Sequence, residues 1–186
     1  MAKQQSKRNS EKRAVDTVFI MLGVTATVIL LIASALTWYG YKFATNMVKT
    51  ELSAQKIYFP AANSQGFSAT EYPGLQKYAG QLVDDGIKAK AYANEYIGHH
   101  LENVAGGKTY SEVSALAMKD PTNAKLAGQK QTLFMGETLR GILLGDGYAY
   151  WMFGMIAMYV SIALFIGACA TALLSFVCVR SLSKLK

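Results

Sequence analysis

The sequence predicts an all-α membrane protein in which two transmembrane helices flank a helical domain of about 100 residues outside the membrane. Three observations favour this class: two long stretches without a charged residue, a Lys/Arg-rich segment at each chain end, and a helical repeat of apolar residues between the stretches. The 186 residues are 52% hydrophobic and only 17% charged, below the quarter that is typical of soluble domains.

The net charge of +7 is concentrated at the two ends of the chain. Residues 1–16 and residues 180–186 each carry a net +3, whereas residues 42–146 carry eleven basic and ten acidic side chains. A nucleic-acid-binding protein needs its basic groups on one folded face. The charge distribution therefore argues against a nucleic-acid partner.

The two charge-free stretches predict transmembrane helices over residues 17–41 and 148–179. Charge-free sequence runs for 25 residues from Thr17 and for 33 residues from Gly147, and a helix needs about 20 apolar residues to cross the hydrocarbon core. The alternative is a buried core helix of a soluble protein, but the remaining chain is too small to wrap two such helices. We expect the longer second helix to tilt or to project above the membrane surface.

The first stretch also has features of a cleavable signal peptide. A basic segment precedes it, and Ala33-Ser34-Ala35 has the form of a cleavage site. The apolar run nevertheless continues into Trp38 and Tyr39, an aromatic pair typical of a membrane interface. We therefore predict an uncleaved signal anchor.

The basic tails predict the orientation. Lys and Arg next to a span stay on the cytoplasmic side, so residues 1–16 and 180–186 are expected in the cytoplasm. The prediction is a multi-pass plasma-membrane protein with residues 42–147 as its extracytoplasmic domain. Lys42 and Lys49 count against this orientation, but Glu51 offsets them and the tails carry more charge.

The first half of this domain is expected to be extended, then a loop, then a helix. Residues 56–60 end in proline and read as a short extended segment, and residues 61–74 have a loop composition. From about Gly74 the apolar residues take a helical spacing that Gly86 is expected to kink or divide. Gly106-Gly107 is expected to end this helix.

Two further helices are expected in the second half. The sequence Thr109-Tyr110-Ser111-Glu112 is a capping-box pattern, which predicts a short helix to about Met118. Asp120-Pro121 predicts the N-terminus of a third helix. We expect this helix to stop at Gly145-Asp146-Gly147, with the second span beginning after the break.

The residues predict no catalytic, cofactor-binding or metal site. Cys169 and Cys178 are nine residues apart on one helix, about 13 Å and too far for a disulfide. His99 and His100 are adjacent and diverge on a helix, so one is expected to face the core and one the solvent, with metal binding or pH sensing as the alternative. Neither span carries an ionisable side chain of the kind that marks ion pathways.

Two short acidic or glycine-rich motifs are also expected to be structural. Asp84-Asp85 resembles a pair of catalytic carboxylates, but Lys88 lies one helical turn away and favours a solvated ion pair. Gly106-Gly107-Lys108-Thr109 resembles the end of a phosphate-binding loop, yet the first glycine of that motif is missing. We interpret it as a turn followed by a helix cap.

Small residues in the spans offer surfaces for helix packing. Such residues let two helix backbones approach closely in a membrane. They can pack the two spans against each other as a hairpin, or against a different protein, and the sequence leaves both open. The candidates are Gly23, Thr27, Gly154, Ser161, Gly167, Ala170 and Thr171.

Four short motifs occur in and beside the predicted extracytoplasmic domain: Leu52–Phe59 (LSAQKIYF), Gly106–Glu112 (GGKTYSE), Asp120-Pro121, and Leu139-Arg140 before an apolar span. Together they resemble a family of small actinobacterial membrane proteins with two spans around an outward loop, and His100 matches a position that is often histidine there. The resemblance covers most of residues 50–177. It implies a plasma-membrane protein without catalysis of its own. Some members are labelled ring-opening dioxygenases, but a non-haem iron site needs two histidines and a carboxylate that converge.

In its size and in its two-span arrangement, the chain resembles the accessory subunits of the actinobacterial cytochrome bc1–aa3 respiratory supercomplex. We therefore expect a non-catalytic accessory subunit of the electron-transport chain that has no cofactor and contacts other membrane subunits and lipids. An extracytoplasmic sensor or cell-envelope protein that signals through a partner is the alternative. The seven residues after Val179 leave no room for a cytoplasmic output domain, and a membrane enzyme is less favoured still.

Overall fold

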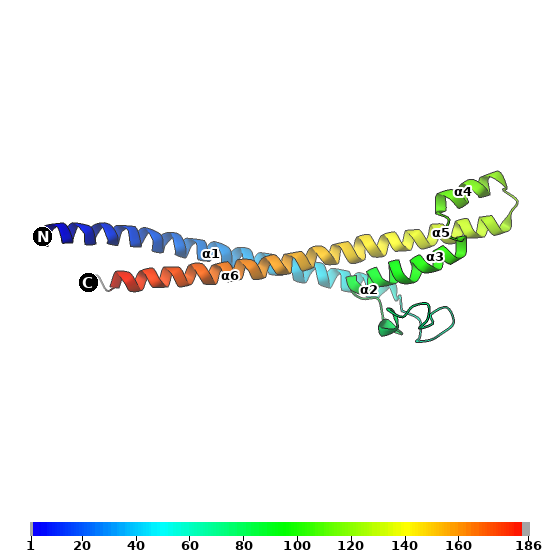
Figure 1. Ribbon diagram of the computed structural model, residues 1–186, viewed down its shortest axis with the longest axis horizontal. Helices are drawn as coiled ribbons and strands as arrows, with labels where there is room; N and C mark the ends of the chain where they lie inside the picture. Colours follow the sequence, from blue (N-terminus) through cyan, green and yellow to red (C-terminus); the bar gives the residue numbers. More distant parts are fainter. Residues whose placement is uncertain (1, 184–186) are drawn as a thin grey trace. The chain divides into compact units, whose positions relative to one another are not determined.

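The computed structural model describes residues 2–183 and is all-helical over that range, apart from two isolated β-bridges, Tyr58–Leu82 and Ser64–Phe67 (Figure 1). The predicted all-α class is confirmed. The chain divides into two compact units. Met1–Lys42 and Met155–Lys186 form the helical hairpin, and Phe43–Gly154 forms the central lobe. Lys184 and Lys186 of the predicted basic tail lie outside the described residues.

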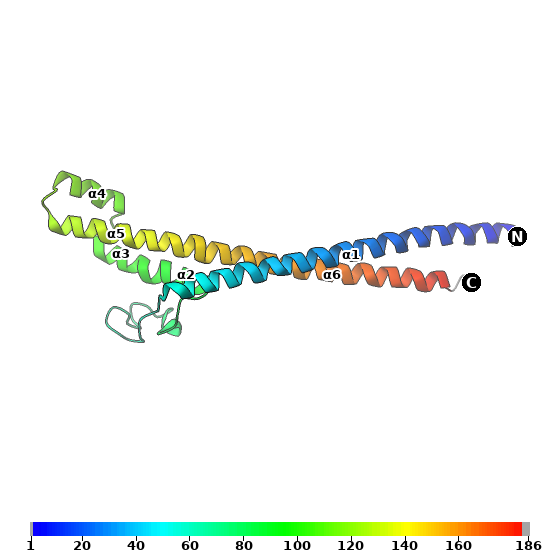
Figure 2. The same ribbon diagram turned by 180° about the vertical axis from the view of Figure 1, so that it is seen from behind.

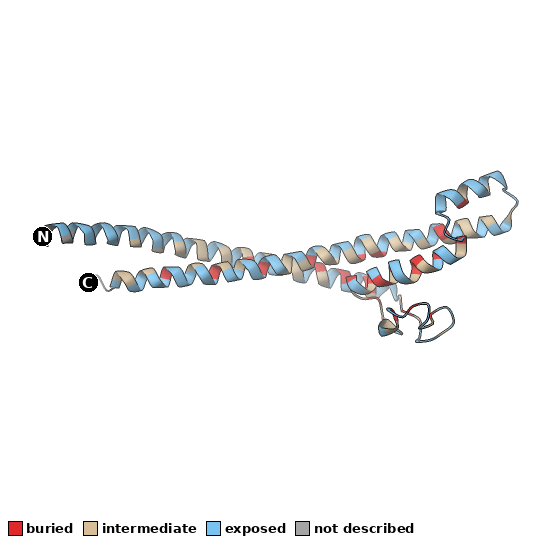
Figure 3. Ribbon diagram, viewed as in Figure 1, coloured by how far each residue is buried: buried red, intermediate tan, exposed pale blue. Residues whose placement is uncertain are grey.

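The helical hairpin contains α1 (Ala2–Gln55) as far as Lys42 and α6 (Tyr150–Ser183) from Met155 onward, and within it the two helices run side by side in opposite directions (Figures 1 and 2). Each belongs to a helix that is long and apolar enough to cross a membrane. Only 6% of the most apolar part of the first helix is buried, and 11% of the second (Figure 3). A core helix of a soluble protein is mostly covered, so neither helix plays that role in this fold.

Helix α1 extends beyond the predicted span at both ends. No proline or glycine interrupts the sequence between Lys42 and Gln55, so nothing local ends the helix there. Ala44, Val48 and Leu52 recur every four residues and are buried in the central lobe. This apolar stripe explains why α1 continues past the charge-free stretch.

The first helix of the central lobe begins later than predicted. Residues 74–84 form the 3-10 helix η1 (Gln76–Tyr78) and a strand-like contact, in which Phe59 N–H donates to Gln81 O at 2.9 Å. Helix α2 (Gly86–Ala91) begins where the Asp85 carboxylate accepts from Lys88 N–H. Gly86 therefore starts the helix rather than kinking it. A Cβ at this position would lie 2.5 Å from Trp151 Cβ, so only glycine fits.

A continuous helical path then leads from α2 to the glycine turn. The π-helical segment η2 (Tyr92–Ile97) follows α2, and α3 (Gly98–Ala105) follows η2. Helix α3 ends at Gly106, which has the left-handed φ of 59° that glycine adopts easily, so the predicted end is confirmed. The predicted capping box is also confirmed, and it starts α4 (Tyr110–Lys119).

The predicted start of the third helix at Asp120-Pro121 is wrong. Helix α5 (Ala124–Ile142) begins three residues later, where the Asn123 side chain accepts from Leu126 N–H at 3.2 Å. The Asp120 carboxylate instead accepts hydrogen bonds from the side chains of Thr122 and Asn123. Asp120 thus stabilises the turn before the helix, and Asn123 is the N-cap.

The predicted break at Gly145-Asp146-Gly147 is also wrong. The π-helical segment η3 (Leu143–Ala149) joins α5 to α6 without interruption. A Cβ at Gly147 would lie 3.0 Å from Ala89 Cβ, which shows that α2 packs closely against η3 at this glycine. Glycine here permits close helix packing, and that packing offsets its low helix propensity.

One hydrophobic core holds the central lobe together. Helices α2, α3 and α4 pack against the α5–η3 helix, and the loop of residues 56–85 contributes aromatic rings to the same core. The most deeply buried large side chains are Phe59, Phe67, Leu75, Val83, Val113 and Leu143. Burial of each stabilises the lobe by about 1.5–3 kcal/mol.

Candidate helix-packing and docking surfaces

Two serines face each other across the helical hairpin and exchange hydrogen bonds. Ser34 Oγ donates to the carbonyl oxygen of Ser161 at 2.9 Å, and Ser161 Oγ donates to the carbonyl oxygen of Ser34 at 2.8 Å. The two residues are only 7% and 3% exposed. Because hydrocarbon offers no hydrogen-bonding partner, such a pair favours one register of the two helices in a membrane.

Two threonines form a second polar contact in the hairpin. Thr27 Oγ1 lies 2.8 Å from Thr171 Oγ1 and 2.7 Å from the carbonyl oxygen of Gly23. It can donate its single proton to either of these oxygens. Thr171 Oγ1 lies 3.1 Å from the carbonyl oxygen of Gly167. A Cβ at Gly23 would lie 2.1 Å from Ser175 Oγ, so α6 approaches α1 closely at this glycine.

The remaining packing candidates take different positions. A Cβ at Gly167 would be in ordinary contact with Leu30, at 3.6 Å. Gly154 is buried, but it belongs to the central lobe. Ala170 is exposed, so the hairpin leaves it uncovered.

Sequence reasoning missed two buried small residues of α6. Ala168 and Ser175 are buried in the hairpin like Ser161. The three residues are spaced by seven, which is the repeat of helices that pack with a left-handed supercoil. Counting small residues at this spacing, rather than at a spacing of four, identifies both.

The Asp84-Asp85 pair acts in helix capping and ion pairing. Lys88 Nζ contacts the Asp84 carboxylate and lies 3.5 Å from Asp85 Oδ2. Partial burial by itself lowers the pKa of Lys88, but the two carboxylates outweigh it and hold the pKa above its ordinary value. The predicted ion pair is present, and it is partly buried rather than fully solvated.

Arg140 connects α5 to the π-helical segment η2. Its Nε donates to the carbonyl oxygen of Ala93 at 3.0 Å, and its Nη1 lies 3.0 Å from the Glu137 carboxylate. π-helical segments leave backbone groups with unusual pairing and often occur at functional sites. Arg140 uses one of these groups as an acceptor, so its role is to stabilise the packing of η2 on α5.

The two histidines diverge, as predicted. His99 is half-buried, with its ring edge-on to Tyr72 at a centroid distance of 5.1 Å, whereas His100 is exposed. Tyr72 also contacts Tyr96, which contacts Tyr92 at 5.0 Å. Burial, with a smaller contribution from Tyr96, raises the pKa of Tyr92, so its hydroxyl stays neutral.

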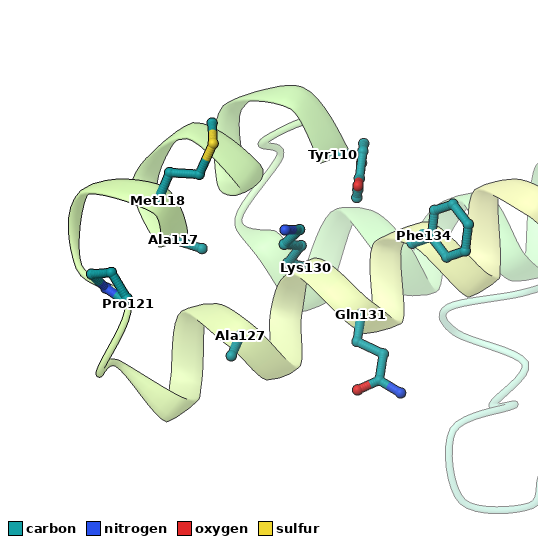
Figure 4. Close-up of a pocket in the computed structure, with 8 residues that line it drawn as sticks. All are labelled: Tyr110, Ala117, Met118, Pro121, Ala127, Lys130, Gln131 and Phe134. Carbon is teal, nitrogen blue, oxygen red and sulfur yellow. The ribbon is translucent and has the colours of Figure 1, made fainter.

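A groove lies between α4 and α5 in the central lobe. It has a volume of about 500 Å³ and is lined by Tyr110, Ala117, Met118, Pro121, Ala127, Lys130, Gln131 and Phe134 (Figure 4). Met118 is 69% exposed and Phe134 is 58% exposed, although neither belongs to a charge-free stretch. Large apolar side chains gathered at a concave surface are typical of protein-binding sites.

A smaller cleft of about 370 Å³ lies between the end of α1 and the α5–η3 helix. Its walls are apolar, including Val48, Leu52 and Ile142, and two carboxylates, Glu51 and Asp146, line it. Both acidic residues are exposed. The cleft therefore carries negative charge at its rim and apolar side chains inside.

Within residues 2–183, no three His, Cys, Asp or Glu side chains converge in a geometry that can hold a metal ion. Cys169 and Cys178 are free thiols. Comparison with known proteins finds no matching protein family, no similar curated protein and no similar solved structure. The resemblance to the actinobacterial two-span proteins, and the respiratory assembly that it implies, therefore stay predictions.

Proposed function

We propose that the chain is a non-catalytic accessory subunit of a plasma-membrane complex. In this proposal the helical hairpin spans the membrane with both termini in the cytoplasm, and the central lobe stands outside and contacts a neighbouring subunit. The assembly that the sequence motifs favour is the actinobacterial cytochrome bc1–aa3 respiratory supercomplex.

The groove between α4 and α5 is the observation that carries the proposal. In the proposed topology the lobe faces water, where exposed Met118 and Phe134 are unfavourable unless another surface covers them. The helical hairpin also supports the proposal of a membrane subunit. The hydroxyl groups of Ser34 and Ser161, and those of Thr27 and Thr171, are paired at the helix–helix contact, and most of the exposed side chains of the hairpin are large and apolar, which suits lipid or the spans of other subunits.

Affinity purification in mild detergent tests the proposal. The full chain carries a tag at one terminus, and the eluted proteins are identified by mass spectrometry, with haem absorbance recorded in parallel. We expect the chain to elute with other membrane subunits, and with haem if the assembly is respiratory. Recovery as a free protein across several gentle detergents contradicts the proposal, and a stable haem-free complex contradicts only the respiratory assignment.

Cysteine labelling in intact cells tests the proposed topology. Lys108→Cys places a thiol on the central lobe, and Ser10→Cys places one on the N-terminal segment, both at exposed positions. A membrane-impermeant maleimide is expected to label the first variant in intact cells and the second only after lysis. The unmodified chain, with Cys169 and Cys178, supplies the background, and labelling of both variants in intact cells contradicts the orientation.

A further inference from the structure

The groove between α4 and α5 combines apolar walls with the positive charge of Lys130, which has no carboxylate partner in the part of the chain that the structure describes. We propose that it docks an acidic amphipathic helix of a partner subunit, with apolar side chains in the groove and an Asp or Glu opposite Lys130. This inference rests on the proposed function, because it names the chemistry of the partner at the same groove.

Apolar side chains stand at both ends of the groove. The rings of Tyr110 and Phe134 contact each other at a centroid distance of 5.8 Å and join α4 to α5 at one end. Met118 and Pro121 lie at the other end, near the turn between the two helices (Figure 4). Amphipathic helices commonly bind such grooves through apolar side chains three and four residues apart.

The carboxylates of α4, of α5 and of the turn between them already have partners within the chain. Glu112 accepts hydrogen bonds from the Thr109 backbone N–H at 2.7 Å and from its hydroxyl at 2.8 Å. The backbone bond first, and the hydroxyl bond second, lower the pKa of Glu112 and keep it ionised in this position. Asp120 accepts from the turn that precedes α5, and Glu137 pairs with Arg140.

In contrast to these carboxylates, the lysines of α4 and α5 have no ion-pair partner among the described residues. Among the described residues, Lys119, Lys125 and Lys130 have no carboxylate within ion-pairing distance. Lys130 is half-buried, and its side chain lies on the side of α5 that faces α4 (Figure 4). Its side chain lines the groove beside apolar residues, and within residues 2–183 its ammonium group has no carboxylate partner. Charge complementarity therefore favours an acidic occupant.

The position of Lys130 favours a protein helix over an anionic lipid surface. A lipid surface attracts lysines that are fully open to solvent, and Lys119 and Lys125 are exposed in this way. Lys130 instead lines a concave groove beside Ala127 and Ala117, two small residues that leave room for side chains of a partner. A carboxylate that reaches Lys130 must therefore be carried into the groove by apolar neighbours, as on an amphipathic helix.

Photo-crosslinking in cells that express the full chain tests the inference. The photoreactive amino acid p-benzoylphenylalanine replaces Met118, and the crosslinked peptide of the captured protein is mapped by mass spectrometry. The same probe at exposed Ile87, which does not line the groove, controls for non-specific capture. Lys130→Glu tests the charge, and Lys49→Glu makes the same charge change at an exposed position outside the groove.

The proposal expects one protein adduct at position 118, mapped to a segment that contains Asp or Glu beside apolar residues. Its yield is expected to fall at least about fivefold with Lys130→Glu and to be unchanged with Lys49→Glu. Changing the mapped acidic residue of the partner to lysine is expected to restore the adduct with the Lys130→Glu chain. This charge exchange also excludes misfolding as the cause of the loss.

Three results overturn the inference: an adduct with lipid alone, an adduct with a segment that lacks acidic residues, or no groove-specific adduct. None of them decides the proposed function by itself, because the hairpin alone can hold the chain in a complex. Co-elution in mild detergent without a groove adduct rejects the docking of an acidic helix and retains the accessory-subunit proposal. If the chain neither co-elutes with other subunits nor gives a groove adduct, both the docking of an acidic helix and the accessory-subunit proposal are rejected.

Discussion

Removal of the hydroxyl groups at Ser34 and Ser161 is expected to weaken the helical hairpin additively. Each hydroxyl donates its single proton to the carbonyl oxygen of the opposite serine, at 2.9 and 2.8 Å, and the two hydroxyl oxygens lie farther apart, at 3.2 Å. Each substitution therefore removes one of these two interhelical hydrogen bonds and leaves the other. Hydrogen bonds between membrane helices contribute about 0.6 kcal/mol on average. We therefore expect about 0.6 kcal/mol for Ser34→Ala or Ser161→Ala, and about 1.2 kcal/mol for both.

The threonine pair provides a contrast with the same chemistry. Thr27 Oγ1 and Thr171 Oγ1 lie 2.8 Å apart and share a hydrogen bond between the two hydroxyls. Either Thr27→Val or Thr171→Val removes that shared bond, so the second substitution adds little to the first. The threonine cycle is therefore expected to show a coupling energy of about 0.6 kcal/mol, and the serine cycle a coupling near zero.

The measurement is a pair of double-mutant cycles on the full chain, with the free energy of unfolding taken from titration of a mild-detergent sample with SDS. Thr25→Val is the matched control, because Thr25 is an exposed residue of the same helix. A serine coupling larger than the threonine coupling refutes the assigned hydrogen bonds. Substitutions in both pairs that behave like the control refute the register of the hairpin.

Three further predictions concern the central lobe. Gly145→Ala is expected to raise the free energy of unfolding of the lobe by up to about 1 kcal/mol, because a Cβ there meets open space. Gly147→Ala is expected to give no such increase, because its Cβ would lie 3.0 Å from Ala89 Cβ of α2. Denaturant unfolding of the two variants measures the difference. Asn123→Ala is expected to cost about 1 kcal/mol and to increase amide exchange in the first turn of α5. Thr109→Ala is expected to raise the lowered pKa of Glu112 toward 4.5, measured by carboxyl NMR. Because that pKa is lowered by folding, the stabilisation from Glu112 is present above 4.5 and is lost as the pH falls through the lowered pKa.

The features that the sequence predicts well depend on local chemistry. The two long apolar helices follow from charge-free length, and both helices that could cross a membrane contain the stretches that begin at Thr17 and Gly147. The capping box at Thr109 and the helix end at Gly106 follow from the backbone groups of a few neighbouring residues. Such features are insensitive to the rest of the fold, so the pattern alone predicts them.

The features that the sequence mispredicts depend on contacts between distant segments. Gly147 resembles a helix terminator, but α2 packs against it and the helix continues. The helical spacing after Gly74 is real, yet residues there pair with the segment at Phe59 before any helix forms. The docking groove has no local signature either, because the exposure of Met118 depends on how α4 lies against α5. Tertiary packing overrides local propensity in each case.

The small residues of the spans limit how a partner can recognise this chain. Polar groups at Thr27, Ser34, Ser161 and Thr171 are paired inside the hairpin, so they are not available to an external helix. What remains on the outer surface of the hairpin is mostly apolar, and such a surface discriminates poorly between lipid and protein. Under the proposed function, specificity must then come from outside the hydrocarbon core, where an apolar groove and an unpaired Lys130 occur together. Substitutions in the groove are therefore expected to change which partner is bound, and substitutions in the hairpin to change how stably the chain is held.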